Sequence, residues 1–411
     1  MEYQPIPVKD ILKKMKDMSS VMIDLAYYSA IYSDETLVDE ILKLGENVDR
    51  LELQLMMQAA LATRSADDAE NIVSIFVLAA SVAKISDATE EIARISRSNL
   101  SLRFPVHAPG MDDVVFRVKV SPASWADGRS LNELFQKQRR VLDVLLVRRG
   151  DKWILEPDPK FVLRGEDTLF AVGLVGNVRK FKEAFGIAEP ASPLKEFPAI
   201  YKSLTEWLVQ FMNFSDFIVD TAYTSLLTSS YDLAENVSDI EEYMDNMLPK
   251  FEQQVLSTTD LSTNDKAALI RIAQESERIS DAARDIGEVI LFGLEPHPII
   301  ADVLQESSER ISIVRAGDEE DGRSIKDLGY ENYGAVVFAV KRKKKWHIRP
   351  PHATFKVKKG DLLIVKYIVE ASVLEGFPEE LKSEEEIERA IEEVRKEEQS
   401  EEGGSSEEIT D

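Results

Sequence analysis

The sequence predicts a multidomain α+β protein in which two antiparallel three-helix bundles alternate with two small α+β domains. Three observations predict this fold. Long segments show the apolar spacing of amphipathic helices, and shorter segments between them alternate apolar and polar residues as half-buried strands do. The same order of segments then occurs a second time, at an offset of about 195 residues. A repeat of this length indicates two copies of a large unit and not a solenoid.

The internal duplication rests on four pairs of matching segments. They are IDLAYYS (23–29) with VDTAYTS (219–225), ISDA (85–88) with ISDA (279–282), DGRSLNEL (127–134) with DGRSIKDL (321–328), and KWILEP (152–157) with KWHIRP (345–350). The offset changes only from 196 to 193 along the chain. Small insertions and deletions in loops account for this drift, so we expect each copy to contain the same elements in the same order.

The first part of each copy, over 1–100 and 191–295, is predicted to be helical. Apolar residues recur there at spacings of three and four. In the first copy this pattern predicts helices over about 7–33, 35–63 and 67–98. Three amphipathic helices with short connections favour an antiparallel bundle.

The second part of each copy, over 101–190 and 296–377, is predicted to be a small α+β domain. In the first copy the segment VVFRVKV at 114–120 alternates as a strand, and the DGRS motif then leads into a short helix. Two further strands flank a tight turn. A fourth strand at 168–175 and a closing helix at 177–185 complete the unit.

The charge composition limits the partners of the protein. The 411 residues carry a formal net charge of −25, which argues against nucleic acid because its phosphates would be repelled. Much of the excess lies in 378–411, an acidic tail that we expect to be partly disordered. The chain has no cysteine, so disulfides, thiolate nucleophiles and cysteine-based metal sites are excluded.

Location and catalysis are constrained by missing motifs. The longest apolar stretch, 72–85, has 14 residues, whereas a membrane span needs about 20. The N-terminus lacks the apolar segment of a signal peptide. We therefore expect a soluble, cytoplasmic protein, which can still sit against a membrane protein. The zinc-protease, P-loop, nucleophile-elbow and kinase motifs do not occur in the sequence, so we do not expect an enzyme.

Four carboxylates in the second helical part have the spacing of one cluster. Glu241 and Asp245 are four residues apart on one predicted helix, and Glu277 and Asp281 are four apart on the next. Residues four apart share a helix face, so two antiparallel helices would bring these acids together. Carboxylate oxygens of this kind bind divalent or iron ions. The alternative is an ordinary solvated acidic face.

The first copy keeps only half of this acidic pattern. Asp49 and Asp87 are weaker candidate ligands, because Gly45 and Ala83 stand four residues before them, where the second copy has glutamate. Glu46 and Glu91 could substitute only with a different geometry, so we expect the acidic site of the first copy to have decayed.

The DGRS segments supply the candidate ligand-binding residues of the α+β domains. Backbone N–H groups at the start of a helix attract anions, and each DGRS segment leads into a short helix. The alternative is a plain turn in which the aspartate and the serine cap the backbone. The candidates are Asp127, Gly128, Arg129 and Ser130 in the first copy, and Asp321, Gly322, Arg323 and Ser324 in the second.

The segment ERISDAARDI at 277–286 resembles the acidic helix of PhoU domains, which are three-helix bundles of phosphate-signalling regulators. The segment LGENVDRLELQL at 44–55 is similar to the preceding helix of that family. In PhoU domains, pairs of acidic residues bind iron or other metal ions. The resemblance implies metal ligands at Glu241, Asp245, Glu277 and Asp281, and in the first copy only at Asp49 and Asp87.

The α+β domains resemble the TrkA-C (RCK-C) domain of potassium-conductance regulators, in the order of their elements and in the DGRS-x-x-x-Leu motif. Members of that family sense small ligands, cyclic di-AMP among them, and act on potassium channels or transporters. They usually follow an NAD-binding Rossmann domain. Here no Gly-x-Gly-x-x-Gly motif follows a strand, so we expect no NAD site. Alternating modules of the two kinds resemble archaeal potassium-channel-related regulatory proteins.

These features predict a non-enzymatic regulator of a cation channel or transporter, with potassium as the expected ion. A small ligand, such as a cyclic dinucleotide, would bind the TrkA-C-like domains, and a membrane channel or transporter would be the partner. The two TrkA-C-like domains would form a pseudo-dimer within the chain, and a homo-oligomer is also compatible with the sequence. The alternative is a metal-binding, PhoU-like regulator of phosphate transport or signalling.

Overall fold

A computed structural model gives the fold of the protein. It describes residues 5–32, 34–62, 65–98, 113–138, 143–150, 152–155, 157–174, 181, 185, 199–306, 309–343, 345–348, 354–368, 377–378 and 381. The predicted closing helix at 177–185 and the acidic tail at 378–411 fall almost entirely outside these residues.

The first bundle consists of α1 (Val8–Tyr32), α2 (Val38–Ala62) and α3 (Ala66–Ile95). The predicted helices are confirmed to within three residues at each end. A short 3-10 turn, Glu35–Leu37, joins α1 to α2, and Asp34 caps it by accepting a hydrogen bond from the backbone N–H of Thr36.

The second bundle repeats this arrangement with α6 (Ala199–Thr228), α7 (Tyr231–Ser257) and α8 (Thr263–Leu291). Its helix starts are strongly marked in the sequence. Ser230 caps α7, and Ser262 forms a reciprocal capping box with Asp265 at the start of α8. These caps satisfy backbone N–H groups that have no partner within the helix.

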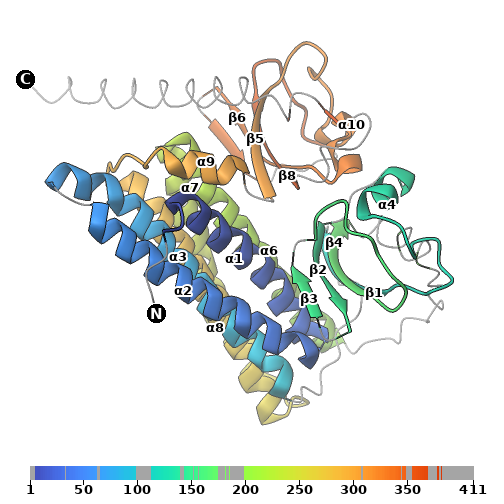
Figure 1. Cartoon of the computed structure of the whole chain (residues 1–411). Helices are drawn as coiled ribbons and strands as arrows, with labels where there is room; N and C mark the ends of the chain where they lie inside the picture. The colour runs from blue at the N-terminus through green and yellow to red at the C-terminus, as the bar shows by residue number, and fades with distance from the viewer. Residues whose placement is uncertain are drawn as a thin grey trace, which may run out of the picture.

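The two bundles pack together as one helical body, with α3 of the first against α8 of the second (Figure 1). A single cluster of buried apolar residues runs through both bundles. Tyr27 of α1 links the two bundles through hydrogen bonds. Its hydroxyl lies 2.9 Å from Oγ of Ser215 on α6 and 2.7 Å from Oγ of Ser276 on α8. The helices are therefore joined by apolar packing and by a buried polar contact.

Each small domain contains a four-stranded antiparallel sheet with the same strand order. The first sheet has β1 (Asp113–Lys119), β2 (Asp143–Arg149), β3 (Lys152–Leu155) and β4 (Thr168–Leu174) in the order β1-β4-β2-β3. The second has β5 (Glu309–Arg315), β6 (Val336–Arg342), β7 (Lys345–Ile348) and β8 (Leu362–Ile368) in the order β5-β8-β6-β7. The short helices α4 (Leu131–Gln138) and α10 (Ile325–Leu328) follow the first strand of each sheet.

The sheets dock on the helical body (Figure 1). Phe170 of β4 lies in the core of the bundles and meets the ring of Tyr28 edge-on at 5.9 Å. In the second domain, α9 (Ile299–Glu306) leads from the bundle into β5 and packs against α1 and α6. The opposite faces of the two sheets contribute to a second buried apolar cluster, which includes residues of both small domains.

One helical segment in the described part of the chain, Ile72–Ile95, is long and apolar enough to cross a membrane. Its most apolar window is 61% buried inside the molecule. The core helix of a soluble protein meets the same criteria, and this segment belongs to α3, which packs against three other helices, α1, α2 and α8.

Candidate functional site

The four carboxylates predicted to cluster in the second bundle do come together. Glu241 and Asp245 lie on α7, and Glu277 and Asp281 lie on α8. The contacts run across the helix pair, since Glu241 lies within hydrogen-bonding reach of Asp281 and Glu277 of Asp245, so that one carboxyl of each pair can donate when it is protonated. The spacing of four residues between the acids on each of two antiparallel helices was therefore sufficient to predict this cluster.

Burial and mutual repulsion raise the pKa of two of these carboxyls above the ordinary value for glutamate. The pKa of Glu277 is raised to about 7, first by burial and then by the charges of Asp281 and Asp245. The pKa of Glu241 is also raised to about 7 by burial, although the neighbouring Arg284 lowers it. Glu241 is only 6% exposed, whereas Asp245 is exposed and the side chain of Asp281 is 42% exposed, so the cluster lies at the edge of the helix pair with Glu241 as its buried member.

Arg284 lies within the same cluster. This residue of α8 follows Asp281 by three positions, and its Nη1 donates a hydrogen bond to Oε1 of Glu241. Its Nη2 is 3.7 Å from Oδ1 of Asp281, and its Nε is 3.6 Å from Oε1 of Glu288. One guanidinium therefore faces carboxylates from both helices, a contact that sequence reasoning missed.

The carboxylates supply the oxygen donors that hard cations take, but the fit to a metal is incomplete. In the part of the chain that the structure describes, no group of three or more His, Cys, Asp or Glu side chains is arranged to hold a metal ion. The guanidinium of Arg284 provides the positive charge beside Glu241 and Asp281. Metal binding at Glu241, Asp245, Glu277 and Asp281 stays a prediction.

The first bundle has an acidic cluster of different composition. Asp49 of α2 and Asp87 of α3 are near each other, as predicted, and the charge of Asp49 raises the pKa of Asp87 after burial. Glu90 and Glu52 join them, and each has its pKa raised first by burial and then by these two aspartates, although Arg94 opposes the shift at Glu90. The sequence did not predict Glu52 or Glu90 as members of this cluster.

Glu90 reaches the cluster because α2 has a glycine opposite it. A β-carbon on Gly45 would lie 1.7 Å from Oε1 of Glu90, so the carboxylate occupies space that any other residue would fill. The position of Gly45 corresponds to Glu241 at the offset of 196 residues. The carboxylate missing from α2 is thus replaced by one from α3. The expectation that the acidic site of this copy has decayed stays a prediction.

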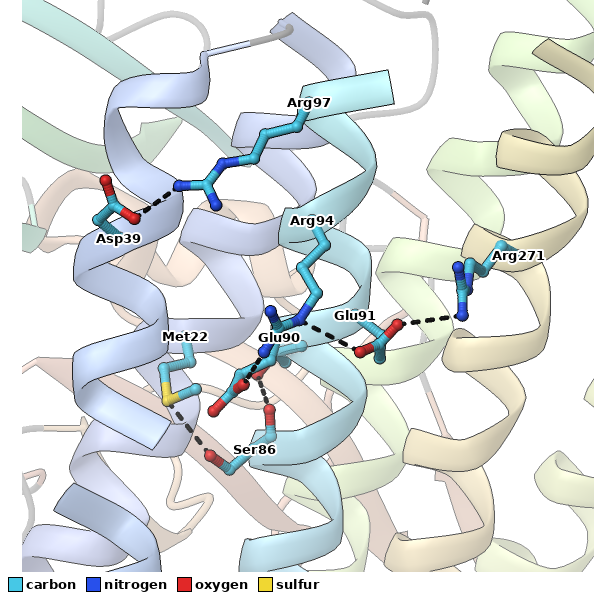
Figure 2. Close-up of polar contacts among 9 residues, drawn as sticks. Met22, Asp39, Ser86, Glu90, Glu91, Arg94, Arg97 and Arg271 are labelled. Carbon is cyan, nitrogen blue, oxygen red and sulfur yellow. Dashed lines mark hydrogen bonds and ion pairs between the residues drawn. The ribbon is translucent and has the colours of Figure 1, made fainter. Parts of the chain in front are cut away.

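A groove follows the seam between α3 and α8, beside the first cluster. Glu91 of α3 forms an ion pair with Arg94 at 3.2 Å and another with Arg271 of α8 at 3.2 Å (Figure 2). The pair with Arg271 links the two bundles. Two adjoining cavities of about 390 and 460 Å³ share Glu91, Arg94 and Arg271 as lining residues. Lys84 and Asp285 form a second ion pair across the seam at 2.5 Å.

The DGRS residues have structural partners in both small domains. Oδ1 of Asp127 accepts a hydrogen bond from the backbone of Gly165, and Asp321 does the same for Lys359. Gly128 and Gly322 adopt positive φ angles of 78° and 77°, which favour glycine.

The two serines cap the following helices. Ser130 exchanges hydrogen bonds with Glu133, and Ser324 forms a capping box with Asp327. Arg129 pairs with Glu133 at 3.0 Å, and Arg323 donates to the backbone carbonyl of Asp327. These contacts account for the motif as a turn, and ligand binding by it stays a prediction.

Comparison with known domain families accounts for most of these elements. The PhoU domain matches residues 12–96 and 208–290, which are the two helical bundles, and the TrkA-C domain matches residues 115–186, which form the first small domain. The chain combines PhoU and TrkA-C domains. Both acidic clusters lie in the PhoU domains, and Asp127–Ser130 lies in the TrkA-C domain.

Solved structures with similarity to this chain include the crystal structure of the GsuK RCK domain, with 13% identity, coverage of 65% of this chain and 63% of that one, and a TM-score of 0.18. The GsuK channel bound to NAD has 13% identity, coverage of 64% and 51%, and a TM-score of 0.17. The GsuK channel has 12% identity, coverage of 64% and 52%, and a TM-score of 0.18. The chain therefore spans less than two thirds of each. No curated protein matches the sequence significantly.

Proposed function

We propose that this protein is a non-enzymatic, cytoplasmic regulator of a potassium channel or transporter. The observation that carries the proposal is the TrkA-C domain at residues 115–186, docked on a helical body that contains two PhoU domains. The TrkA-C domain supports a regulatory role in potassium transport. The net charge of −25 makes nucleic acid an unfavourable partner, which agrees with a protein partner at the membrane.

The contacts between sheets and helices suggest how a signal would pass. Arg117 of β1 pairs with the mostly buried Asp34 at 2.9 Å, and Lys366 of β8 pairs with Asp220 of α6 at 2.8 Å. A ligand that shifts either sheet would have to change these ion pairs and the packing of Phe170 on the bundle. In this proposal the small domains bind the ligand, and the helical body presents the response to the channel or transporter.

The arrangement of the small domains supports a pseudo-dimer within one chain. Their sheets have the same strand order, and buried residues of both belong to one apolar cluster. Two such domains in one chain would replace the homodimer that a single-copy protein needs. A cyclic dinucleotide is the first ligand to test, with Arg129 and Arg323 as the candidate phosphate contacts.

The test is potassium transport in the host with and without this protein. Deletion of the gene is expected to change rubidium uptake, and the wild-type chain is expected to restore it. A chain carrying K366E, which breaks the ion pair between β8 and α6, is expected to bind ligand without restoring regulation. Unchanged rubidium uptake in the deletion strain, together with no membrane transporter recovered with the tagged protein, would overturn the proposal.

Phosphate-linked signalling is a second candidate, and the two PhoU matches favour it. In that case the acidic clusters would be central and the partner would be a phosphate transporter or sensor kinase. The double variant E241A/E277A separates the candidates. A lost response to phosphate starvation with normal rubidium uptake would favour phosphate signalling, and the reverse would favour the potassium proposal.

A further inference from the structure

The second acidic cluster contains a cation of its own. Arg284 donates to Glu241, lies 3.7 Å from Asp281, and is 3.6 Å from Glu288 on the next turn of α8. We infer that Arg284 is the permanent counter-ion of this cluster and takes the place of a metal ion, so that the second PhoU domain folds without metal. This inference does not depend on the proposed role in potassium transport.

The charge of the cluster explains why a counter-ion is needed. Glu241, Asp245, Glu277 and Asp281 carry a formal charge of −4 when all four are ionised, and Glu241 is buried. Packing four carboxylates together is costly unless a cation or bound protons offset their repulsion. A guanidinium keeps its charge at all physiological pH values and can contact several carboxylates at once, so it serves this role without a bound ion.

The first bundle shows the same positions with the charges reversed. At the offset of 194 residues, Glu90 stands where the second bundle has Arg284, and Arg94 stands where it has Glu288. Both are i,i+4 ion pairs, of 2.8 Å in the first bundle and 3.6 Å in the second. In each pair, one residue faces the acidic cluster, and we call it the inner residue. It is the acid Glu90 in the first bundle and the arginine Arg284 in the second.

The residue on the opposite helix changes in step with this reversal. Where the inner residue is Arg284, α7 provides Glu241 to receive it. Where the inner residue is Glu90, α2 provides Gly45, whose missing side chain leaves room for the carboxylate. If substitutions in one cluster had accumulated without any structural requirement, a change on one helix would not be matched by a complementary change on the facing helix. The matched exchange indicates that Arg284 is a built-in part of the second cluster.

The incomplete fit to a metal has the same cause. A metal ion seated among Glu241 and Asp281 would have to displace the guanidinium from both of them. Displacement would cost the charge-assisted hydrogen bond to Glu241 and would place two cations side by side. Removal of the guanidinium charge, by contrast, would leave four oxygen-donor side chains open to a divalent ion.

The test is a titration of the full chain with Mn²⁺ after dialysis against a chelator, with the electron paramagnetic resonance signal of free Mn²⁺ as the readout. We expect R284Q to bind one more Mn²⁺ per chain than the wild type. R284K, which keeps the positive charge, should bind no more than the wild type. R97Q is the control, because Arg97 also pairs with an acid, Asp39, at 2.6 Å but is a member of neither acidic cluster, and it should bind no more Mn²⁺ than the wild type.

Thermal unfolding gives a second readout. Mn²⁺ is expected to raise the melting temperature of R284Q and a chelator to reverse the rise, whereas the wild type should respond to neither. An R284Q chain that folds only when Mn²⁺ is added also supports the inference. Two results would overturn it: R284Q gains no Mn²⁺, or the wild type binds Mn²⁺ and loses one equivalent in E277Q. The second result does not require R284Q to fold.

Discussion

The carboxylate of Glu90 lies directly over the backbone of Gly45, where a β-carbon would approach Oε1 to 1.7 Å. This contact joins α2 to α3 and brings the carboxylate of Glu90 to Asp49 and Asp87, which Glu52 also approaches. Glu90 is held from the other side by Arg94, whose Nη2 donates to Oε2 at 2.8 Å. A glycine in a helix interior normally costs about 0.5–1 kcal/mol relative to alanine, so Gly45 is explained by the space that it leaves.

The contact predicts an energetic coupling between positions 45 and 90. In an E90A background, G45A should stabilise the protein by about 0.5–1 kcal/mol, because alanine favours helix more than glycine does. In the wild-type background this gain should vanish, since the new methyl group displaces Glu90 from Arg94. A double-mutant cycle in urea should therefore give a coupling energy of about 1 kcal/mol. Equal effects of G45A in both backgrounds would contradict the contact.

The acidic cluster of the second bundle predicts a pH dependence of stability. The pKa of Glu277 rises from an ordinary value of 4.5 to about 7 in the folded protein, chiefly through burial. Between these values the folded state binds a proton that the unfolded state has released. The free energy of unfolding therefore falls as the pH rises from about 4.5 to 7, by about 1–2 kcal/mol for this half-buried group after allowance for solvent screening.

The measurement is the melting temperature at pH 5.5 and pH 8. The wild type is expected to melt at a higher temperature at pH 5.5, and E277Q should lose part of this difference because glutamine does not titrate. E242Q is the matched control, since Glu242 is an exposed acid on the neighbouring helix α7. A pH dependence that is unchanged in E277Q would show that the proton is bound elsewhere.

Helical periodicity and carboxylate spacing predicted much of this site, and their success has a physical cause. The apolar spacing fixes which face of each helix is buried, and residues four apart on one face must then meet the facing helix. That is enough to bring Glu241 and Asp245 to Glu277 and Asp281. The helix boundaries follow from equally local patterns, whereas the strand order of the small domains does not, because β1 pairs with β4, which lies about 50 residues further along the chain.

The roles of Arg284 and Glu90 could not be predicted in the same way. A change of charge sign at one position looks like the loss of a site until its partner on another helix is known. Gly45 gave a signal, because glycine is unfavourable in a helix interior, but the signal does not say which side chain fills the space. The seam between α3 and α8 was equally hidden, because the charged residues of α3 that pair across it, Lys84 and Glu91, look like an ordinary solvated face until their partners on α8 are known.

The hydrogen bonds of the buried Tyr27 hydroxyl predict that the protein loses stability when this hydroxyl is removed. Y27F should lower the free energy of unfolding by about 1–2 kcal/mol, because the hydrogen bonds to Ser215 and Ser276 are lost while the ring packing is kept. Urea unfolding of the full chain measures this cost. Y243F is the control, since Tyr243 is 52% exposed, and it should change stability by less than about 0.5 kcal/mol. Similar losses in both variants would refute a bridging role for Tyr27.

An arginine–aspartate pair stabilises the turn before the last strand in each small domain. Arg342 donates to both oxygens of Asp361 through Nε at 2.9 Å and Nη2 at 2.6 Å, and the backbone of Lys358 donates to the same carboxylate at 2.9 Å. Arg149 and Asp167 form the same contact in the first domain, at 2.8 and 2.6 Å. These aspartates are buried, whereas their arginines are partly exposed.

Loss of the charge on Asp361 should therefore loosen the second sheet locally. Replacing it by asparagine keeps the shape but leaves Arg342 without a carboxylate, which we expect to cost about 1–3 kcal/mol after allowance for solvent around the arginine. Hydrogen exchange of the β6 and β8 amides measures this cost in the domain itself. D318N is the matched control, because Asp318 also pairs with a cation, here Lys359 at 2.7 Å, but its side chain is 83% exposed. If D318N accelerated exchange as much as D361N, burial of the pair would not be the source of its strength.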